Sequence, residues 1–272
     1  MDMKHGFLID LDGTLYRGHE PIPHAAAFIR MLNDKSMPYL LVTNNSSRTP
    51  EQVAEHMREL GIDVPAAAVY TSSQAAAQYL TEQQQGQRVH MIGEAGLQIA
   101  LEAAGFLLNE GTPDYVVQGI DRSFTYAKLT EAVRHLHSGA TYVVTNPDRI
   151  LPSDGGLLPG AGSLAASITA ASGVEPVVIG KPSPIIMAYA IERLGLPAAD
   201  VWVIGDNAAT DIRGGAMAGC RTALVLTGVA TTANVHEQLA SAGVTPDLIC
   251  EDLQDFVMQT RLNDGAGFAN RP

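Results

Sequence analysis

Short apolar runs that stop at a polar residue recur along this chain, and they restrict its fold more than any other feature. Phe7-Leu8-Ile9 stops at Asp10, and Tyr39-Leu40-Leu41-Val42 stops at Thr43. Such short runs, bounded by polar residues, are typical of strands buried on both faces of a sheet. Similar runs follow at 89–92, 115–117, 142–144, 177–179, 201–204 and 222–226.

Helical stretches separate these runs, so that strands and helices alternate. Pro50, which suits the first turn of a helix, begins a predicted helix that ends near Gly61. The alternation predicts an α/β protein built on a parallel sheet. Other predicted helices cover about 22–33, 72–82, 163–171 and the stretch up to Leu194, and the Pro- and Gly-rich segment 146–162 is predicted to be a loop.

The composition suits a folded globular protein and disfavours several partners. With 272 residues, 46% of them hydrophobic and 17% charged, the chain can bury the core of one large or two smaller domains. The formal net charge is 17 − 29 = −12, and Lys and Arg form no cluster. Because polyanions are bound by basic patches, we expect no nucleic-acid partner and no membrane partner.

The cysteines and the N-terminal sequence bear on location. Cys220 and Cys250 form neither a CxxC pair nor a disulfide framework, which is typical of a reducing compartment. Asp10 and Asp12 interrupt the apolar N-terminal run, and 155–174 is too weakly apolar to span a bilayer. We therefore expect a soluble cytoplasmic protein, either a monomer or a homodimer.

Polar groups at the ends of four predicted strands are the main functional signal. They are Asp10-Leu11-Asp12, Thr43-Asn44-Asn45, Lys181 and Asp206-Asn207. Ligands in open α/β sheets bind beyond the carboxyl ends of the strands. If the sheet is parallel, all four groups face one crevice.

The same residues resemble the ordered motifs of the haloacid dehalogenase (HAD) superfamily. Asp10-Leu11-Asp12-Gly13-Thr14-Leu15 is similar to its first motif and Thr43-Asn44 to its second. Lys181 is similar to the third, and 205–211 to the fourth, in the family's order. The resemblance covers about residues 6–260 and implies a Rossmann-like parallel-sheet core with an inserted α/β cap.

Within the superfamily, the chain resembles the NagD-like, or 4-nitrophenylphosphatase-like, phosphatases. The roughly 100 residues between the second and third motifs look like their large C2-type cap, and 145–148 and 180–184 are also similar to them. The resemblance implies a core formed by 1–79 and 180–262 and a cap at 80–179. The Gly- and Asn-rich tail at 263–272 is predicted to be disordered.

The resemblance implies a magnesium-dependent phosphatase for small phosphate esters, such as sugar phosphates or nucleoside monophosphates. Asp10 is then the nucleophile that forms an aspartyl-phosphate, and Asp12 is the general acid and base. Asp10 and Asp206 would bind Mg²⁺ with the backbone carbonyl of Asp12, and Asp211 would bind it directly or through water. The cation offsets a repulsion of about 4 kcal/mol between carboxylate and phosphate charges ~4 Å apart.

The remaining expected roles concern phosphate and specificity. We expect four residues to bind the phosphate group. They are Leu11 through its backbone N–H, Thr43 through its hydroxyl, Asn44, and Lys181 through its positive charge. The loop that contains Asn146, Asp148 and Arg149 is the expected specificity element. Ala208 and Ala209 stand where relatives often carry bulkier or charged residues, a difference that concerns specificity more than chemistry.

Other interpretations remain open at this point. An acidic cluster with a Thr and a Lys also occurs in phospho-Asp receiver modules, and a phosphotransferase or phosphomutase would differ only in its acceptor. Gly160-Ala161-Gly162-Ser163-Leu164-Ala165 fits the dinucleotide fingerprint but follows a loop, so cofactor binding is not expected. The eight histidines show no metal-binding spacing, and His135 and His137 point different ways on a predicted helix.

Overall fold

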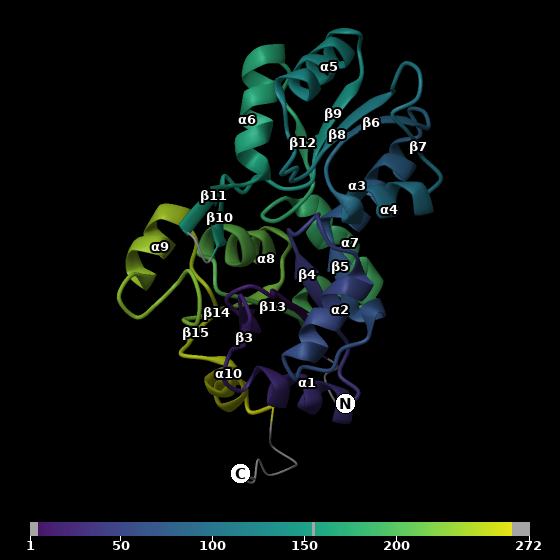
Figure 1. The fold of residues 1–272 in the computed structure, drawn as a ribbon. Coiled ribbons are helices and arrows are strands. Elements are labelled where there is room, and N and C mark those ends of the chain that lie inside the picture. Colours follow the sequence, from purple (N-terminus) through teal and green to yellow (C-terminus); the bar gives the residue numbers. More distant parts are fainter. Residues whose placement is uncertain (1–4, 154–155, 263–272) are drawn as a thin grey trace. The chain divides into compact units, whose positions relative to one another are not determined.

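The computed structural model describes residues 5–153 and 156–262, which form two compact units (Figure 1). Unit one comprises Met1–Leu41, Met57–Val64 and Ile191–Pro272, and unit two comprises Val42–His56 and Pro65–Ala190. Three elements run from one unit into the other: β4 (Tyr39–Thr43), α2 (Pro50–Glu59) and α7 (Pro184–Leu194). The predicted tail at 263–272 lies outside the described residues.

Unit one is built on a parallel sheet with the strand order β15-β14-β13-β1-β4, and β5 follows β4 in the same sheet. The chain leaves β1 toward β4 on one side, whereas β13 lies on the other side, so the strand order reverses beside β1. Such a reversal is where α/β sheets bind ligands. The bounds are β1 Gly6–Ile9, β2 Tyr16–Arg17, β3 Glu20–Pro21, α1 Ala25–Asp34, η2 Ala198–Asp200, β13 Val201–Gly205, η3 Ala208–Ile212, α8 Arg213–Met217, β14 Arg221–Val225, α9 Val235–Ala242, β15 Leu248–Cys250 and α10 Leu253–Thr260.

Four aromatic side chains hold α1 and α10 against the sheet of unit one. Phe7, Phe28 and Phe256 contact one another edge to face, with ring centroids 6.0–6.3 Å apart. Trp202 meets Phe256 in the same geometry at 5.4 Å. Edge-to-face pairs add about 0.5–1.5 kcal/mol each to the burial of apolar area. The strand that precedes Asp10 is therefore firmly held.

Unit two contains a second parallel sheet, the cap sheet, with the order β12-β9-β8-β6-β7. In Figure 1, α5 and α6 lie on one face of this sheet and α3 and α4 lie on the other. The bounds are η1 Ala66–Ala68, β5 Val69–Thr71, α3 Ser72–Gln83, β6 Arg88–Ile92, α4 Ala95–Ala103, β7 Leu107–Leu108, β8 Tyr115–Gln118, α5 Tyr126–His137, β9 Thr141–Val144, β10 Ile150–Ser153, β11 Gly156–Pro159, α6 Ala161–Ser172 and β12 Val177–Val178.

Local sequence explains where the cap helices begin and which face they bury. Thr71 and Gln74 form a capping box at the start of α3, and the hydroxyl of Thr125 accepts a hydrogen bond from the N–H of Lys128 at the start of α5. Ala132 and Leu136, one turn apart on α5, pack on the cap sheet. Spacing by four residues places both on the same helix face.

The predicted α/β class and most predicted strands and helices are confirmed, but the prediction of a plain loop at 146–162 is wrong. Ile150 to Ser153 pair antiparallel with Gly156 to Pro159 as the hairpin β10–β11. Pro is compatible with such a two-stranded ribbon, because each strand has a free edge. Helix α6 begins at Ala161, two residues earlier than expected.

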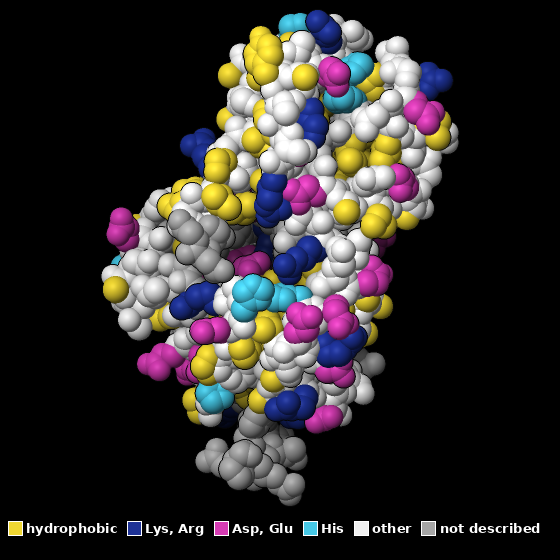
Figure 2. Space-filling model, in the orientation of Figure 1, with side chains coloured by type: hydrophobic (Ala, Val, Ile, Leu, Met, Phe, Trp, Pro, Cys, Tyr) yellow, Lys and Arg dark blue, Asp and Glu magenta, His cyan; other side chains and the backbone are white. Residues whose placement is uncertain are grey.

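The surface and helix lengths add two observations. Among the described residues, no helix combines the length and apolarity needed to cross a bilayer. On the face shown in Figure 2, Lys and Arg side chains are interspersed with Asp and Glu side chains.

Candidate active site

Three carboxylates meet in unit one at the point where the strand order reverses. Asp10 follows β1 and Asp206 follows β13, and these strands pair through Ile9 and Ile204. The N–H of Asp10 donates to the carbonyl of Ile204 at 2.9 Å, which aligns the two strand ends. Asp211 lies in the π-helical turn η3, and one carboxylate oxygen of each of Asp10, Asp206 and Asp211 lies within 4.8 Å of the other two.

Two glycines make this approach of carboxylates possible. Gly13 has a φ of +86°, and a Cβ there would lie 2.2 Å from a carboxylate oxygen of Asp206. A Cβ on Gly205 would lie 2.3 Å from the carboxyl carbon of Asp211. Both distances are far below van der Waals contact, so any larger residue would displace a carboxylate.

A loop that sequence reasoning missed supports Asp206. The N–H of Val229 donates to the Asp206 carboxylate, and the N–H of Ala230 donates to the Asp206 carbonyl at 2.9 Å. Thr227 donates its hydroxyl proton to the carbonyl of Gly13 at 2.6 Å. One sequence feature could have revealed this loop: Thr227 and Gly228 come shortly after the apolar strand β14. The polar groups identified in the sequence likewise come after apolar strands.

The two acids of the first motif lie in different environments. Asp10 is half-buried, whereas Asp12 is exposed and accepts a 3.4 Å hydrogen bond from the hydroxyl of Tyr16. Between them Leu11 is buried, and its carbonyl accepts from the N–H groups of Thr14 and Leu15. A turn therefore begins at Leu11, so the two acids do not belong to one extended strand, in which both would point to the same face.

The other predicted site residues lie in unit two and are linked by hydrogen bonds. Thr43 and Lys181 are each 4% exposed. The ammonium group of Lys181 donates to the carbonyl of Val42 at 2.9 Å, and the amide of Asn44 donates to the carbonyl of Lys181 at 3.0 Å. The end of β4 is thereby fastened to the segment that follows β12.

Two of the three predicted specificity residues belong to the same network. The amide of Asn146 donates to the carbonyl of Asn44 at 2.8 Å, and Asp148 accepts from the side-chain amide of Asn44 at 3.1 Å. Arg149, by contrast, is exposed. Within unit two, Asn146 and Asp148 thus position Asn44, whereas Arg149 presents its charge to solvent.

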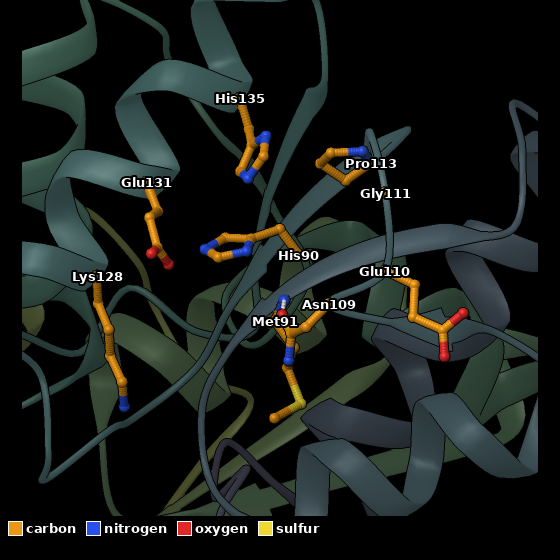
Figure 3. Close-up of a pocket in the computed structure, with 9 residues that line it drawn as sticks. All are labelled: His90, Met91, Asn109, Glu110, Gly111, Pro113, Lys128, Glu131 and His135. Carbon is orange, nitrogen blue, oxygen red and sulfur yellow. Dashed lines mark hydrogen bonds between the residues drawn. The ribbon is translucent and has the colours of Figure 1, made fainter.

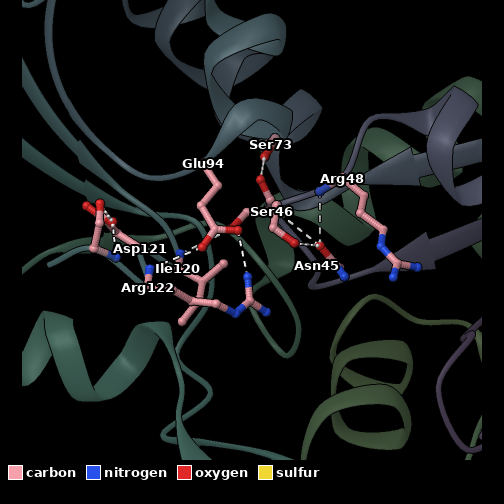
Figure 4. Close-up of polar contacts among 10 residues, drawn as sticks. Asn45, Ser46, Arg48, Ser73, Glu94, Ile120, Asp121 and Arg122 are labelled. Atoms are coloured by element: carbon pink, nitrogen blue, oxygen red, sulfur yellow. Dashed lines mark hydrogen bonds and ion pairs between the residues drawn. The ribbon is translucent and has the colours of Figure 1, made fainter. Parts of the chain in front are cut away.

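A second layer of contacts fixes the residues that follow Asn44 (Figure 4). Asn45 accepts from the N–H groups of Ser47 and Arg48, and Ser73 donates to the carbonyl of Ser46 at 3.0 Å. Nearby, Arg122 and Glu94 form a 2.6 Å ion pair. The contacts of Asn45 and Ser73 thus fix the backbone that follows Asn44.

The donor set in unit one fits a hard divalent cation. Three carboxylates offer only oxygen, which Mg²⁺ prefers over nitrogen or sulfur. Like charges this close repel one another, and Asp206 and Asp211 are 3% and 1% exposed, so water screens the repulsion poorly. A bound cation removes this repulsion.

Comparison with family models places the N-terminal and C-terminal parts of the chain in one family. Residues 7–107 match the model of haloacid dehalogenase-like hydrolases, and residues 178–256 match a second HAD-hydrolase-like model. The two matches include Asp10, Thr43, Lys181, Asp206 and Asp211.

Relatives and solved structures agree with the family models. The chain is 44% identical over 260 residues to an acid sugar phosphatase of Staphylococcus aureus, covering 95% of this chain and 99% of that protein. It is 46% identical over 229 residues to the 5'-nucleotidase YutF of Bacillus subtilis, covering 84% and 90%. The p-nitrophenyl phosphatase of Archaeoglobus fulgidus aligns with a TM-score of 0.89 at 34% identity, covering 94% of this chain and 99% of that one. NagD of E. coli K-12 aligns with a TM-score of 0.85 at 33% identity, covering 93% and 98%.

Proposed function

Because this chain belongs to the haloacid dehalogenase-like hydrolases and is a phosphatase of their NagD and p-nitrophenyl phosphatase type, we propose that it hydrolyses small phosphomonoesters with Asp10 as the nucleophile. The observation that carries the proposal is the meeting of Asp10, Asp206 and Asp211 where β1 and β13 end. A receiver module is set aside because the named relatives are phosphatases and a nucleotidase.

The proposed reaction has two steps on Asp10. Its carboxylate attacks phosphorus and forms an aspartyl-phosphate while the ester oxygen leaves. Water then attacks that phosphorus and releases inorganic phosphate. Each step moves one proton, onto the leaving oxygen in the first step and off the water in the second.

Asp12 is the proposed carrier of this proton. Its exposed carboxyl and its hydrogen bond from Tyr16 set it apart from the half-buried Asp10. An acid that exchanges protons with solvent and one that attacks phosphorus need such different surroundings. The turn at Gly13 supports this division of roles.

We propose that Asp10, Asp206 and Asp211 hold Mg²⁺ together with the backbone carbonyl of Asp12. When bound, the cation offsets the repulsion between carboxylate and phosphate and orients the ester. The chain contributes the oxygen ligands, and the loop at 227–230 keeps Asp206 in place. Asp211 is held through a 3.2 Å hydrogen bond from the N–H of Asn207.

We propose that four residues bind the phosphate: Leu11 through its backbone N–H, Thr43 through its hydroxyl, Asn44, and Lys181 through its positive charge. Their support is the family resemblance of the motifs together with the network in unit two that fixes Asn44 and Lys181. The substrate classes proposed are sugar phosphates and nucleoside monophosphates, since the named relatives act on sugar phosphates and on 5'-nucleotides.

We propose Arg149 as the specificity residue of its loop and Asn146 and Asp148 as residues that position Asn44. The strands of the cap sheet all lie between Arg88 and Val178, which supports a cap at 80–179. The free, buried thiols of Cys220 and Cys250 support a reducing compartment, and we propose the cytoplasm.

The direct test is phosphate release from a panel of sugar phosphates, nucleoside monophosphates and 4-nitrophenyl phosphate. Wild-type protein, Asp10→Asn and the exposed control Asp63→Asn are compared with Mg²⁺ and with EDTA. We expect release by the wild type and the control only, and only with Mg²⁺. Release by Asp10→Asn at the wild-type rate would disprove the nucleophile, and undiminished release in EDTA would disprove the metal requirement.

A further inference from the structure

A cavity in unit two is lined by none of the residues proposed above as catalytic. Its volume is about 350 Å³, and it is bordered by β6, by α5 and by the segment around Asn109. Figure 3 shows His90 and His135 one above the other at this cavity, with Glu131 beside them. None of these residues belongs to a motif identified in the sequence.

His90 is a buried polar residue with an unsatisfied ring nitrogen. It lies on β6, is 8% exposed, and its Nε2 is a buried atom with no hydrogen-bond partner among the described residues. A buried polar atom without a partner costs about 1–3 kcal/mol. Figure 3 shows the ring of His90 directed into the cavity, toward the side where Glu131 and His135 lie.

Two further donors face His90 from one side of α5. Glu131 and His135 are four residues apart on this helix, which puts both side chains on the same face. The rings of His90 and His135 have centroids 4.7 Å apart and are tilted by 48°. A carboxylate and an imidazole at this helical spacing, facing a third donor on a strand, form a ligand set of the kind that metals use.

The charges around the cavity favour a cation over an anion. Glu110 and Glu131 border it, and its one basic side chain among the described residues, Lys128, donates to Asp121 at 2.6 Å and to Ser123 at 2.8 Å. The charge of Lys128 is thus offset within the protein. Neutral imidazoles offer lone pairs, which suit a metal ion.

We propose that His90, Glu131 and His135 bind a divalent transition metal of the zinc type. Two imidazole nitrogens and one carboxylate oxygen are a common ligand set for Zn²⁺, whereas Mg²⁺ prefers oxygen alone. The side chain of Glu131 is exposed, so its rotation to complete the set costs little. The metal would satisfy Nε2 of His90 and join α5 to β6.

The two metal sites of the chain then differ in chemistry. We consider groups of three Asp, Glu, His or Cys side chains whose ligand atoms all lie within 4.8 Å of one another. Among the described residues, Asp10, Asp206 and Asp211 form the one such group. In the cap, the ligand atoms of His90, Glu131 and His135 come this close only after side-chain rotation. Binding there is therefore expected to stabilise unit two, because a ligand that binds only the folded state raises the melting temperature.

The test is a titration of chelator-treated, full-length protein with Co²⁺ in the presence of excess Mg²⁺. Co²⁺ is the probe because nitrogen ligands change its visible absorption, and Zn²⁺ is then added as competitor. We expect one Co²⁺ per chain with the spectrum of nitrogen ligation, displaced by Zn²⁺. The same binding should persist in Asp206→Asn, which lacks a ligand of the oxygen site.

Matched variants decide which side chains bind. His135→Gln and Glu131→Gln should weaken Co²⁺ binding about tenfold or more, which corresponds to about 1.4 kcal/mol. His137→Gln changes a histidine of the same helix that does not border the cavity, and it should bind as the wild type does. Glu131 is exposed, so Glu131→Gln tests the site even if His135→Gln proves unstable. Absence of nitrogen-ligated Co²⁺, or equal affinity in wild type and Glu131→Gln, would overturn the proposal.

Discussion

Two clusters around buried carboxylates, one in each unit, have opposite electrostatic designs. In unit one, Asp206 and Asp211 are buried and gather with Asp10, so negative charge accumulates. In unit two, Asp121 is 3% exposed and accepts from the ammonium of Lys128 at 2.6 Å and from the hydroxyl of Ser123 at 2.7 Å. The first cluster brings three carboxylates together, as a cation site does, whereas in the second a lysine of the same unit pairs with the carboxylate.

This difference separates a functional cluster from a structural one. Accumulated negative charge costs stability unless a cation binds, so it persists where a cation is used. Burial raises the pKa of the Asp121 carboxyl, but hydrogen bonds from Lys128 and Ser123 outweigh that effect, and the pKa lies below its ordinary value. The charged form of Asp121 therefore stabilises the folded state.

The largest expected effect comes from Asp206→Asn. Loss of one carboxylate from the metal-binding group should lower kcat/KM by on the order of 10²–10³-fold. The Mg²⁺-free protein should remain at least as stable as the wild type, because one repulsive charge is gone. Kinetics and thermal melts in EDTA check both. A marked loss of stability in EDTA would show that Asp206 is structural and would break the comparison.

Magnesium itself should stabilise the wild-type protein. At a concentration 100-fold above Kd, a ligand of the folded state contributes about 2.7 kcal/mol, visible as a rise in Tm. Asp121→Asn should retain this rise and Asp206→Asn should lose it. If Asp206→Asn keeps the full rise, magnesium binds elsewhere.

Asp121→Asn should destabilise the protein by about 1–2 kcal/mol at neutral pH while phosphatase activity is kept, since a charged hydrogen bond is lost. Because the folded pKa is depressed, the stabilisation is present above the unfolded pKa and is lost as pH falls through the folded pKa. The difference in stability between wild type and variant should therefore shrink at acidic pH. Urea unfolding across pH measures this, and a constant difference would contradict it.

Ser123→Ala should give the smallest effect, about 0.5–1 kcal/mol, since Lys128 still neutralises Asp121. The variant removes one of the hydrogen bonds that depress the pKa of Asp121, so that pKa should rise toward its ordinary value. NMR titration of the Asp121 carboxyl carbon measures the shift. An unchanged pKa would mean that the Ser123 hydroxyl contributes nothing to the depression, which Lys128 and the backbone N–H of Ser123 would then account for.

Much of the fold and part of the candidate site could be predicted because their signals are local. Runs such as Phe7 to Ile9 are apolar regardless of what surrounds them, and the acids that follow them are adjacent in sequence. The hairpin β10–β11 was missed because its Pro and Gly residues indicate loops, whereas cross-strand pairing decided the outcome. The specificity roles and the exact boundaries of the cap stay predictions.

By itself the sequence determined the α/β class, the longer apolar strands and the identity of Asp10, Asp12, Lys181 and Asp206 as motif residues. The reason is that periodicity and motif order are carried by neighbouring residues. Only the tertiary structure decided that Val229 and Ala230 hold Asp206, and that His90 and His135, 45 positions apart, lie with ring centroids 4.7 Å apart. These contacts depend on sheet register and helix packing, which join residues without any shared local pattern.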